Sequence, residues 1–219
     1  MPENSWIASG RAEAPKKTDK AFAWIKTNRE TFIGSLVILV AAIIFGVYFF
    51  MHYRGLRDTA WKNLFMAQQL GFSGNPDQAQ QQLAAIEANY GSTSAAPYAS
   101  MTKGDIFFAQ NKFKEAGEQY AKVLNDRELG AFASYNLGKC KEAAGDLAGA
   151  QAQYSDFLSK TPEHYIAPEV HASLARSQEL AGAKDLAKLS YEKISLLYPD
   201  TTWAMMAKAR LTPPAPAKK

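Results

Sequence analysis

One segment of the chain constrains its fold more than any other. Residues 31–51 read TFIGSLVILVAAIIFGVYFFM and contain 21 positions without a charged side chain. A helix rises about 1.5 Å per residue, so this segment would be about 32 Å long, close to the hydrocarbon thickness of a bilayer. It is longer than the apolar region of a cleaved signal peptide, and no small-x-small cleavage site follows it. The sequence therefore predicts an uncleaved transmembrane helix over 31–51, with a buried core helix as the alternative.

Residues around and within this segment predict its orientation and packing. Trp24 precedes it and Tyr53 follows it, at positions where amphipathic rings favour the membrane interface. Five lysines and arginines lie within the 15 residues before the segment and three within the 15 after it, which favours a cytoplasmic N-terminus. Ala42 and Gly46 form a small-xxx-small pair that could pack on another membrane helix.

The chain after the apolar segment repeats itself. Four alanines recur at separations of 37, 34 and 37 residues, and four other positions keep a fixed distance from each of them. Repeats of this length are typical of stacked supersecondary units. The five columns are Ala67, Gly104, Gly138, Ala175; Gly74, Asn111, Gly145, Gly182; Ala79, Ala116, Ala150, Ala187; Leu83, Tyr120, Tyr154, Tyr191; and Ile86, Val123, Phe157, Ile194.

Each column has a physical interpretation as part of a helical hairpin. The first small residue lies mid-helix, where a partner helix can cross closely, and the Gly or Asn ends that helix in the left-handed conformation. Asn75 and Asp146 are placed to be N-caps of the second helix, and Pro76 suits its first turn. The reference alanine allows close approach, and the aromatic and aliphatic columns fill the seam. The sequence thus predicts an all-α fold of about four stacked hairpins.

At this repeat length the chain resembles the tetratricopeptide repeat, a 34-residue helix-turn-helix unit. The third copy, YNLGKCKEAAGDLAGAQAQYSDFLSKTP, supplies the pair Leu137 and Gly138, then Ala150, the aromatic Tyr154 and Pro162. The other copies are degenerate. The resemblance implies an α-solenoid scaffold and leaves the partner open.

The expected boundaries follow from these patterns. We expect a cytoplasmic tail and pre-membrane segment over 1–30 and the membrane helix over 31–51. The repeat domain is expected over 58–211, where YPDTTWAMMAKARL (198–211) acts as a capping helix. Residues 1 to about 20 and the tail 212–219, TPPAPAKK, are expected to be disordered.

In tetratricopeptide proteins a groove is lined by first-helix residues at fixed distances from the small mid-helix residue. Transferred to this chain, the groove is aromatic at its membrane-proximal end and charged at its far end. Such polarity suits extended polypeptide or an apolar helix, with packing between hairpins as the alternative role for the aromatics. The predicted groove residues are Trp61, Leu64, Tyr98, Met101, Asp105, Phe108, Phe132, Tyr135, Lys139, Glu142 and Arg176.

No combination of residues in the sequence suggests catalysis or a cofactor. The histidines His52, His164 and His171 have no metal-ligand or nucleophile partners at a recognisable spacing. Cys140 is the single cysteine, which excludes an intrachain disulfide, and it lies in an apolar helical pattern typical of a buried residue. The 19 basic and 17 acidic residues after Met51 alternate in sign, so no basic stripe for nucleic acid is expected.

The layout of the whole chain narrows the resemblance. The segments AFAWIKTNRETFIGSLVILVAAIIFGVYFF, HYRGLRDTAWKNLFMAQQL and YGSTSAAPYASM, taken together, resemble the YfgM-like family of ancillary subunits of the bacterial SecYEG translocon, over residues 20–211. This implies a single-pass inner-membrane protein with periplasmic repeats. Its partners would be the translocon, a periplasmic chaperone and secretory polypeptide clients. Two alternatives stay open: a tethered assembly factor for an envelope, division or respiratory complex, and a non-catalytic scaffold for an enzyme.

Overall fold

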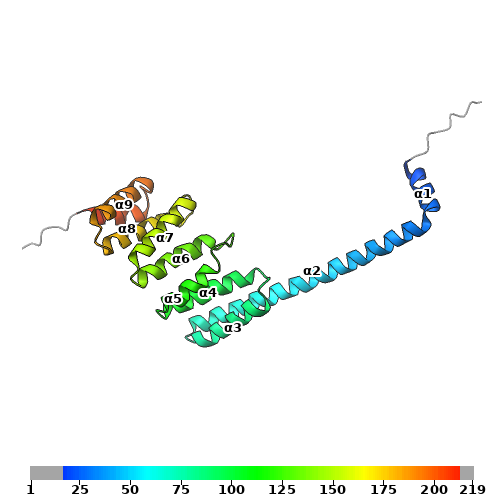
Figure 1. The fold of residues 1–219 in the computed structure, drawn as a ribbon, viewed down its shortest axis with the longest axis horizontal. Helices are drawn as coiled ribbons and strands as arrows, with labels where there is room; N and C mark the ends of the chain where they lie inside the picture. The colour runs from blue at the N-terminus through cyan, green and yellow to red at the C-terminus, as the bar shows by residue number, and fades with distance from the viewer. Residues whose placement is uncertain (1–16, 213–219) are drawn as a thin grey trace, which may run out of the picture. The chain divides into compact units, whose positions relative to one another are not determined.

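A computed structural model describes residues 17–212, which are helical throughout apart from short turns (Figure 1). The tails predicted to be disordered lie outside these residues, except that Lys17–Lys20 begin the first helix and Thr212 follows the last. The prediction of an all-α fold is confirmed for the described residues. The helices are α1 (Lys17–Thr27), α2 (Arg29–Phe72), α3 (Pro76–Asn89), α4 (Ala95–Ala109), α5 (Phe113–Ala121), α6 (Gly130–Ala143), α7 (Leu147–Lys160), α8 (Ala167–Leu180), α9 (Lys184–Leu197) and α10 (Thr202–Leu211).

The chain divides into two units, with the boundary between Arg54 and Gly55. The first unit contains α1 and the apolar part of α2. Among the described residues α2 is the one helix long and apolar enough to cross a membrane, and none of its most apolar window is buried in protein. A core helix would bury these side chains, so α2 is a candidate membrane anchor or signal sequence.

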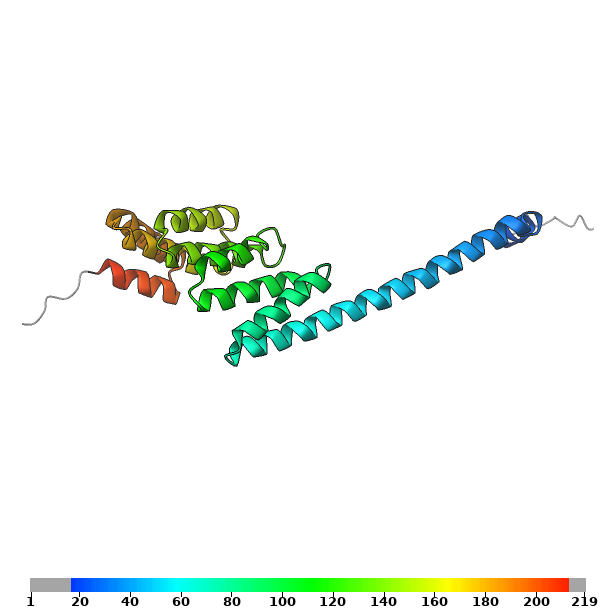
Figure 2. The ribbon, with the colours of Figure 1, turned by 60° about the horizontal axis from the view of Figure 1, so that its bottom comes forward.

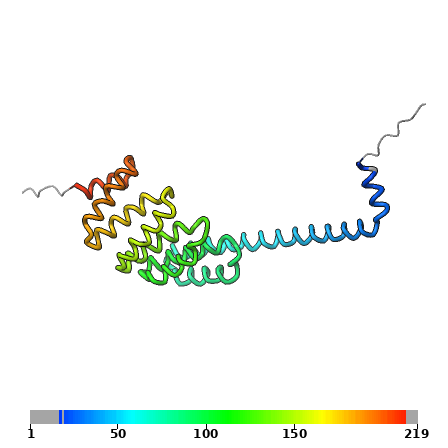
Figure 3. Tube along the Cα trace, turned by 45° about the horizontal axis from the view of Figure 1, so that its top comes forward, coloured from blue at the N-terminus to red at the C-terminus, as the bar shows by residue number. Residues whose placement is uncertain are grey.

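The second unit is a stack of helical hairpins (Figures 2 and 3). The part of α2 after Gly55 pairs with α3 through a shared core of Leu64, Leu83 and Ile86. The next hairpins are α4 with α5, α6 with α7, and α8 with α9, and α10 packs on α9 and α8. The predicted four hairpins and final capping helix are therefore confirmed.

The four hairpin turns share one backbone conformation. Gly74, Gly145 and Gly182 have φ angles of 83°, 84° and 77°. Asn111 has φ 59° and is the one non-glycine residue with positive φ among residues 17–212. Glycine adopts this region without strain and asparagine tolerates it better than most residues. The column predicted from spacing alone is thus confirmed at every copy.

The two predicted N-caps differ from each other. The Asp146 side chain accepts a hydrogen bond from the Gly149 backbone N at 2.9 Å, as a capping residue should. Asn75 occupies the N-cap position of α3, but its side chain makes no capping hydrogen bond, so that part of the prediction is wrong. Pro76 stands at the first helical position, as predicted, where its missing N–H costs no intrahelical hydrogen bond.

The small mid-helix residues and the seam tyrosines fit each other directly. A Cβ added at Gly104 would lie 2.6 Å from Tyr120 Cε1, and one added at Gly138 would lie closer still to Tyr154. Both rings are almost completely buried. The close helix crossing predicted from the spacing is therefore a contact between a glycine backbone and an aromatic ring.

Candidate functional site

The predicted groove residues lie on α2 after Gly55, α4, α6 and α8. Together with α10, these helices form what we call the first-helix face. The side chains of the predicted residues differ widely in exposure. Leu64 is only 2% exposed and belongs to the core of the first hairpin, so its side chain is unavailable to a partner. Tyr135 is 8% exposed, and its ring likewise packs in a core cluster. The remaining nine are exposed or partly exposed.

An aromatic pair marks the N-terminal end of this face. The rings of Trp61 and Tyr98 lie 5.0 Å apart between centroids, and Trp61 is 38% exposed. Trp61 Nε1 donates a hydrogen bond to Ser94 Oγ at 3.2 Å, and the Tyr98 hydroxyl donates to Glu128 Oε2 at 3.2 Å. Both rings are therefore oriented by polar contacts while part of their surface remains open to a partner.

Lys139 connects two aromatic residues near the middle of the face. Its Nζ lies 5.3 Å from the ring centroid of Phe108 and 5.5 Å from that of Tyr135. These are cation–π distances, so the ammonium is held over the rings rather than extended into solvent. Phe108 and Met101 pack against the core of the second hairpin with part of each side chain exposed.

Phe132 lies in an aromatic cluster that the sequence did not reveal. His164 and Tyr165, from the loop between α7 and α8, lie 5.4 and 5.7 Å from Phe132 between ring centroids, and Tyr165 is 75% exposed. His164 Nδ1 accepts a hydrogen bond from the Ile166 backbone N at 3.3 Å. The sequence feature that could have indicated this cluster is the dipeptide His164-Tyr165, but it lies in a loop that the repeat columns do not cover.

Hydrogen-bonded chains link successive hairpins at the C-terminal end of the face. The Tyr154 hydroxyl donates to Glu142 Oε2 at 2.9 Å, and Arg176 Nε donates to Glu142 Oε1 at 2.8 Å. The next hairpin repeats this arrangement with Tyr191, Glu179 and Arg210, at 2.9 Å and 3.1 Å. Each glutamate thus joins a tyrosine of its own hairpin to an arginine of the following unit.

The earlier copy uses a shorter version of the same contact. Phe108 stands where the glutamate would be, and the Tyr120 hydroxyl instead donates to Asp105 Oδ1 at 2.7 Å. Burial and the adjacent carboxylates raise the pKa of Tyr120, and they raise that of Tyr191 to about 12. These tyrosines are consequently protonated donors at neutral pH. Their polar role was missed because the repeat column indicated only aromatic packing.

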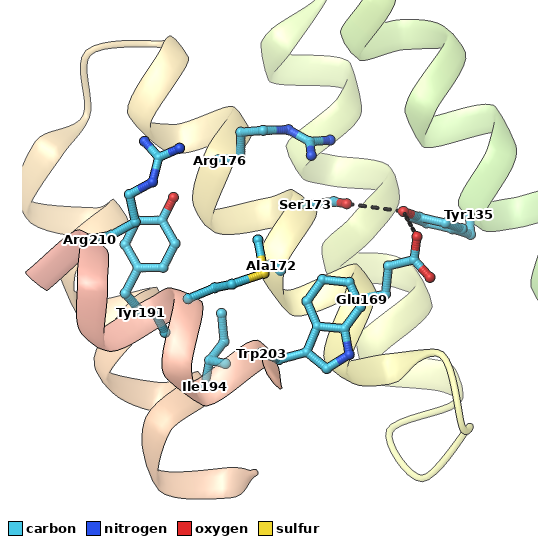
Figure 4. A pocket seen from close by; sticks show the side chains of 11 residues that line it. Tyr135, Glu169, Ala172, Ser173, Arg176, Tyr191, Ile194, Trp203 and Arg210 are labelled. Atoms are coloured by element: carbon cyan, nitrogen blue, oxygen red, sulfur yellow. Dashed lines mark hydrogen bonds between the residues drawn. The ribbon is translucent and has the colours of Figure 1, made fainter. Parts of the chain in front are cut away.

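A pocket of about 180 Å³ lies between α8 and α10, with α9 as its floor (Figure 4). Tyr135 Oη donates to Glu169 Oε1 at 2.8 Å and lies 3.1 Å from Ser173 Oγ, on one side of the pocket. Figure 4 shows Arg210 with Tyr191 on the other side. The apolar surface comes from Ala172, Ile194, Trp203, Met206 and Ala207, and Arg176 completes the lining.

A second pocket, of about 450 Å³, lies between the C-terminal end of α2, the start of α3 and α4. It includes the predicted residue Asp105 together with Gln68 and Ile106. Phe72 lines it and is 93% exposed, although it is a large apolar side chain. Exposed apolar surface beside a pocket is typical of an interaction site.

The predicted membrane-packing pair lies in the first unit. Ala42 and Gly46 are exposed along α2, and a Cβ built at Gly46 meets nothing within 4 Å among the described residues beyond its own stretch of helix backbone. A second helix could therefore approach this surface closely, and packing there stays a prediction.

The described residues do not suggest catalytic chemistry. No group of three His, Cys, Asp or Glu side chains within residues 17–212 could hold a metal ion. Cys140 is buried, and burial raises its pKa to about 11, so almost none of it is the reactive thiolate at neutral pH. His171 is also buried, with a pKa lowered by burial to about 4. The fold is one that typically serves as a non-enzymatic scaffold.

Comparisons with known proteins agree with this architecture. Residues 22–153, more than half of the 219-residue chain, match the tetratricopeptide repeat-like domain family. Two crystal structures of a Podosopora anserina putative kinesin light chain with nearly identical TPR-like repeats are similar in fold, with TM-scores of 0.59 for a single-substitution variant and 0.58 for the other. Each is 14% identical, and the match covers 71% of this chain and 84% of the other. None of the curated proteins matches the chain.

Proposed function

Since the chain belongs to the tetratricopeptide repeat-like domain family, we propose that it is a membrane-anchored scaffold that binds polypeptide on its first-helix face. The family and fold support a role in protein–protein interaction. The anchor is the apolar part of α2, whose length and composition suit a bilayer. That the ligand is a polypeptide is the more specific part of the proposal. It is supported by the aromatic and charged side chains of the first-helix face.

One observation carries the proposal: the first-helix face keeps aromatic and charged side chains in fixed orientations while leaving them partly exposed. Trp61 and Tyr98 are held by hydrogen bonds at one end, and Arg176 and Arg210 by glutamates at the other. Residues that served only packing would be buried, as Leu64 is. Aromatic and arginine side chains that are exposed yet preorganised are typical of protein-binding surfaces.

The finer assignment places the protein in the bacterial inner membrane as an ancillary translocon subunit. Its repeats would face the periplasm and help a periplasmic chaperone receive secretory chains. The lysine and arginine bias before the apolar segment supports this orientation, and the resemblance to the YfgM-like family supports the partners. The main alternative is a tethered assembly factor that uses the same face on a dedicated partner in another envelope, division or respiratory complex.

Photocrosslinking in intact membranes tests the binding face and identifies the partner together. A photoreactive amino acid at Trp61 or Arg176 should capture a protein, whereas one at Ala152, exposed on α7, should not. The double variant Trp61→Ser, Tyr98→Ser should reduce the capture at position 176. Equal capture from all three positions would refute the assigned face, and a capture confined to a different envelope complex would favour the alternative.

Orientation needs a separate measurement. Ala152→Cys gives an exposed thiol, and the buried Cys140 adds little background. A membrane-impermeant maleimide that reaches the periplasm should label position 152 in intact cells. Labelling only after the inner membrane is opened would place the repeats in the cytoplasm and remove the translocon assignment.

A further inference from the structure

The repeat itself explains why a pocket lies between α8 and α10. The residue three positions before the small mid-helix residue is Leu64, Met101, Tyr135 and Ala172 in successive copies. Leu64 and Tyr135 are buried, and Met101 packs partly buried against its core. These large side chains fill the space beside the next first helix. Ala172 has one carbon in its side chain, and the pocket of about 180 Å³ lies directly beside it.

The size and lining of the pocket restrict what it can accept. An apolar cavity of about 150 Å³ is large enough to hold benzene, so this one accommodates a phenylalanine, leucine or methionine side chain. Ile194, Trp203 and Met206 provide apolar walls. A side chain entering here would occupy the place that Tyr135 or Leu64 fills in the earlier copies.

Two guanidinium groups at the rim add a charge requirement. Arg176 uses Nε for Glu142, and Arg210 uses one Nη for Glu179. Their remaining N–H groups make no hydrogen bond with the described residues, and the two side chains are 51% and 60% exposed. The glutamates hold both arginines in place, and the free donors can bind a carboxylate from outside the domain.

We infer that this pocket binds a polypeptide segment in which a large apolar side chain stands beside an aspartate or glutamate. The apolar side chain enters next to Ala172, and the carboxylate binds Arg176 and Arg210. The inference rests on the proposed function, since it specifies which polypeptides the first-helix face selects. The chain's own residues 213–219 are proline, alanine and lysine, so they contain neither a large apolar side chain nor an aspartate or glutamate.

The test uses the full-length protein in detergent and an array of 12-residue synthetic peptides that together cover the sequence of α-lactalbumin. Wild-type protein should bind peptides in which Phe, Leu or Met adjoins Asp or Glu. Ala172→Met introduces the residue that Met101 provides in the second copy, and it should weaken these spots about tenfold or more because the pocket is filled. Ala152→Met, on an exposed face of α7, is the matched control and should bind as wild type does.

A second variant tests the charge requirement independently of how well Ala172→Met folds. Arg210→Gln should reduce binding to peptides with an Asp or Glu neighbour severalfold and leave their Asn or Gln versions unchanged. If both variants melt at the wild-type temperature and bind the same peptides as strongly as wild type does, the assigned pocket is refuted. The proposal that the protein binds polypeptide would then still stand. A wild-type protein that bound no peptide on the array would refute the inference and the proposed function together.

Discussion

At the scale of single residues, the hairpin turns depend on a backbone conformation rather than on contacts. A Cβ built at Gly145 meets no atom within 4 Å, yet the φ angle of 84° disfavours any L side chain. We therefore expect Gly145→Ala to lower the free energy of unfolding by about 1–2 kcal/mol, measured by urea denaturation. Asn111→Gly is the matched opposite change and should raise stability by a few tenths of a kcal/mol. If Gly145→Ala were as stable as wild type, the turn would have adopted another backbone conformation at no cost, contrary to this expectation.

His171 predicts a specific pH dependence of stability. Burial, with the nearby Lys193 charge, lowers its pKa from 6.5 to about 4 in the folded protein. Between these values the unfolded chain binds the proton and the folded chain does not, so stability falls as the pH drops from about 7 to 4. The contribution is on the order of 3 kcal/mol across that interval.

Denaturation of the His171→Asn variant isolates this contribution from that of the carboxylates. Its stability should change less than that of wild type between pH 7 and pH 4.5, even if its stability at pH 7 is lower. Parallel pH profiles for the two proteins would contradict the assigned pKa.

At the scale of helices, the hairpins are coupled by the chain Tyr154, Glu142 and Arg176. Glu142 is mostly buried, so Tyr154→Phe removes the donor to its Oε2 and should cost about 1–2 kcal/mol, although Arg176 still donates to Oε1. Arg176 is half exposed, and Arg176→Gln should cost less than about 1 kcal/mol. A double-mutant cycle should show that the two effects are not additive. Lys160→Gln, which removes an exposed ion pair with Asp156, is the control and should be near neutral.

These helices also show what the sequence can and cannot predict. Fixed columns predicted all four turns because positive φ selects glycine or asparagine, and they predicted the seam because a small residue recurs opposite an aromatic one. The same columns could not predict that Tyr154 donates to Glu142, since a bond between helices depends on their crossing geometry. For the same reason Leu64 was expected in the groove but lies in the core. Arg210 was missed because it lies on α10, which has no second helix to complete a repeat and so was not aligned with the other copies.

At the scale of the whole repeat domain, α10 completes the stack. It packs on α9 and α8, with Ala204 and Ala207 buried, and it covers part of the surface around Ile194. A chain ending at Tyr198 should expose this surface and lower the melting temperature by several degrees, because the apolar cluster of α8 and α9 would lose the helix that covers it. A chain ending at Thr212 is the control for shortening. Identical melting curves for the two truncations would show that α10 does not act as a cap.

The column that contains Ala172 has a consequence for how such a protein changes its partners. Every unit presents the same position to the next one, and a large side chain there fills space that Ala172 leaves open beside α10. A single exchange, such as Tyr135→Ala with Ala172→Tyr, would move the open interface by one unit while the backbone stays the same. Duplicated hairpins can therefore acquire a binding pocket at a new position through point mutation, while the fold stays the same.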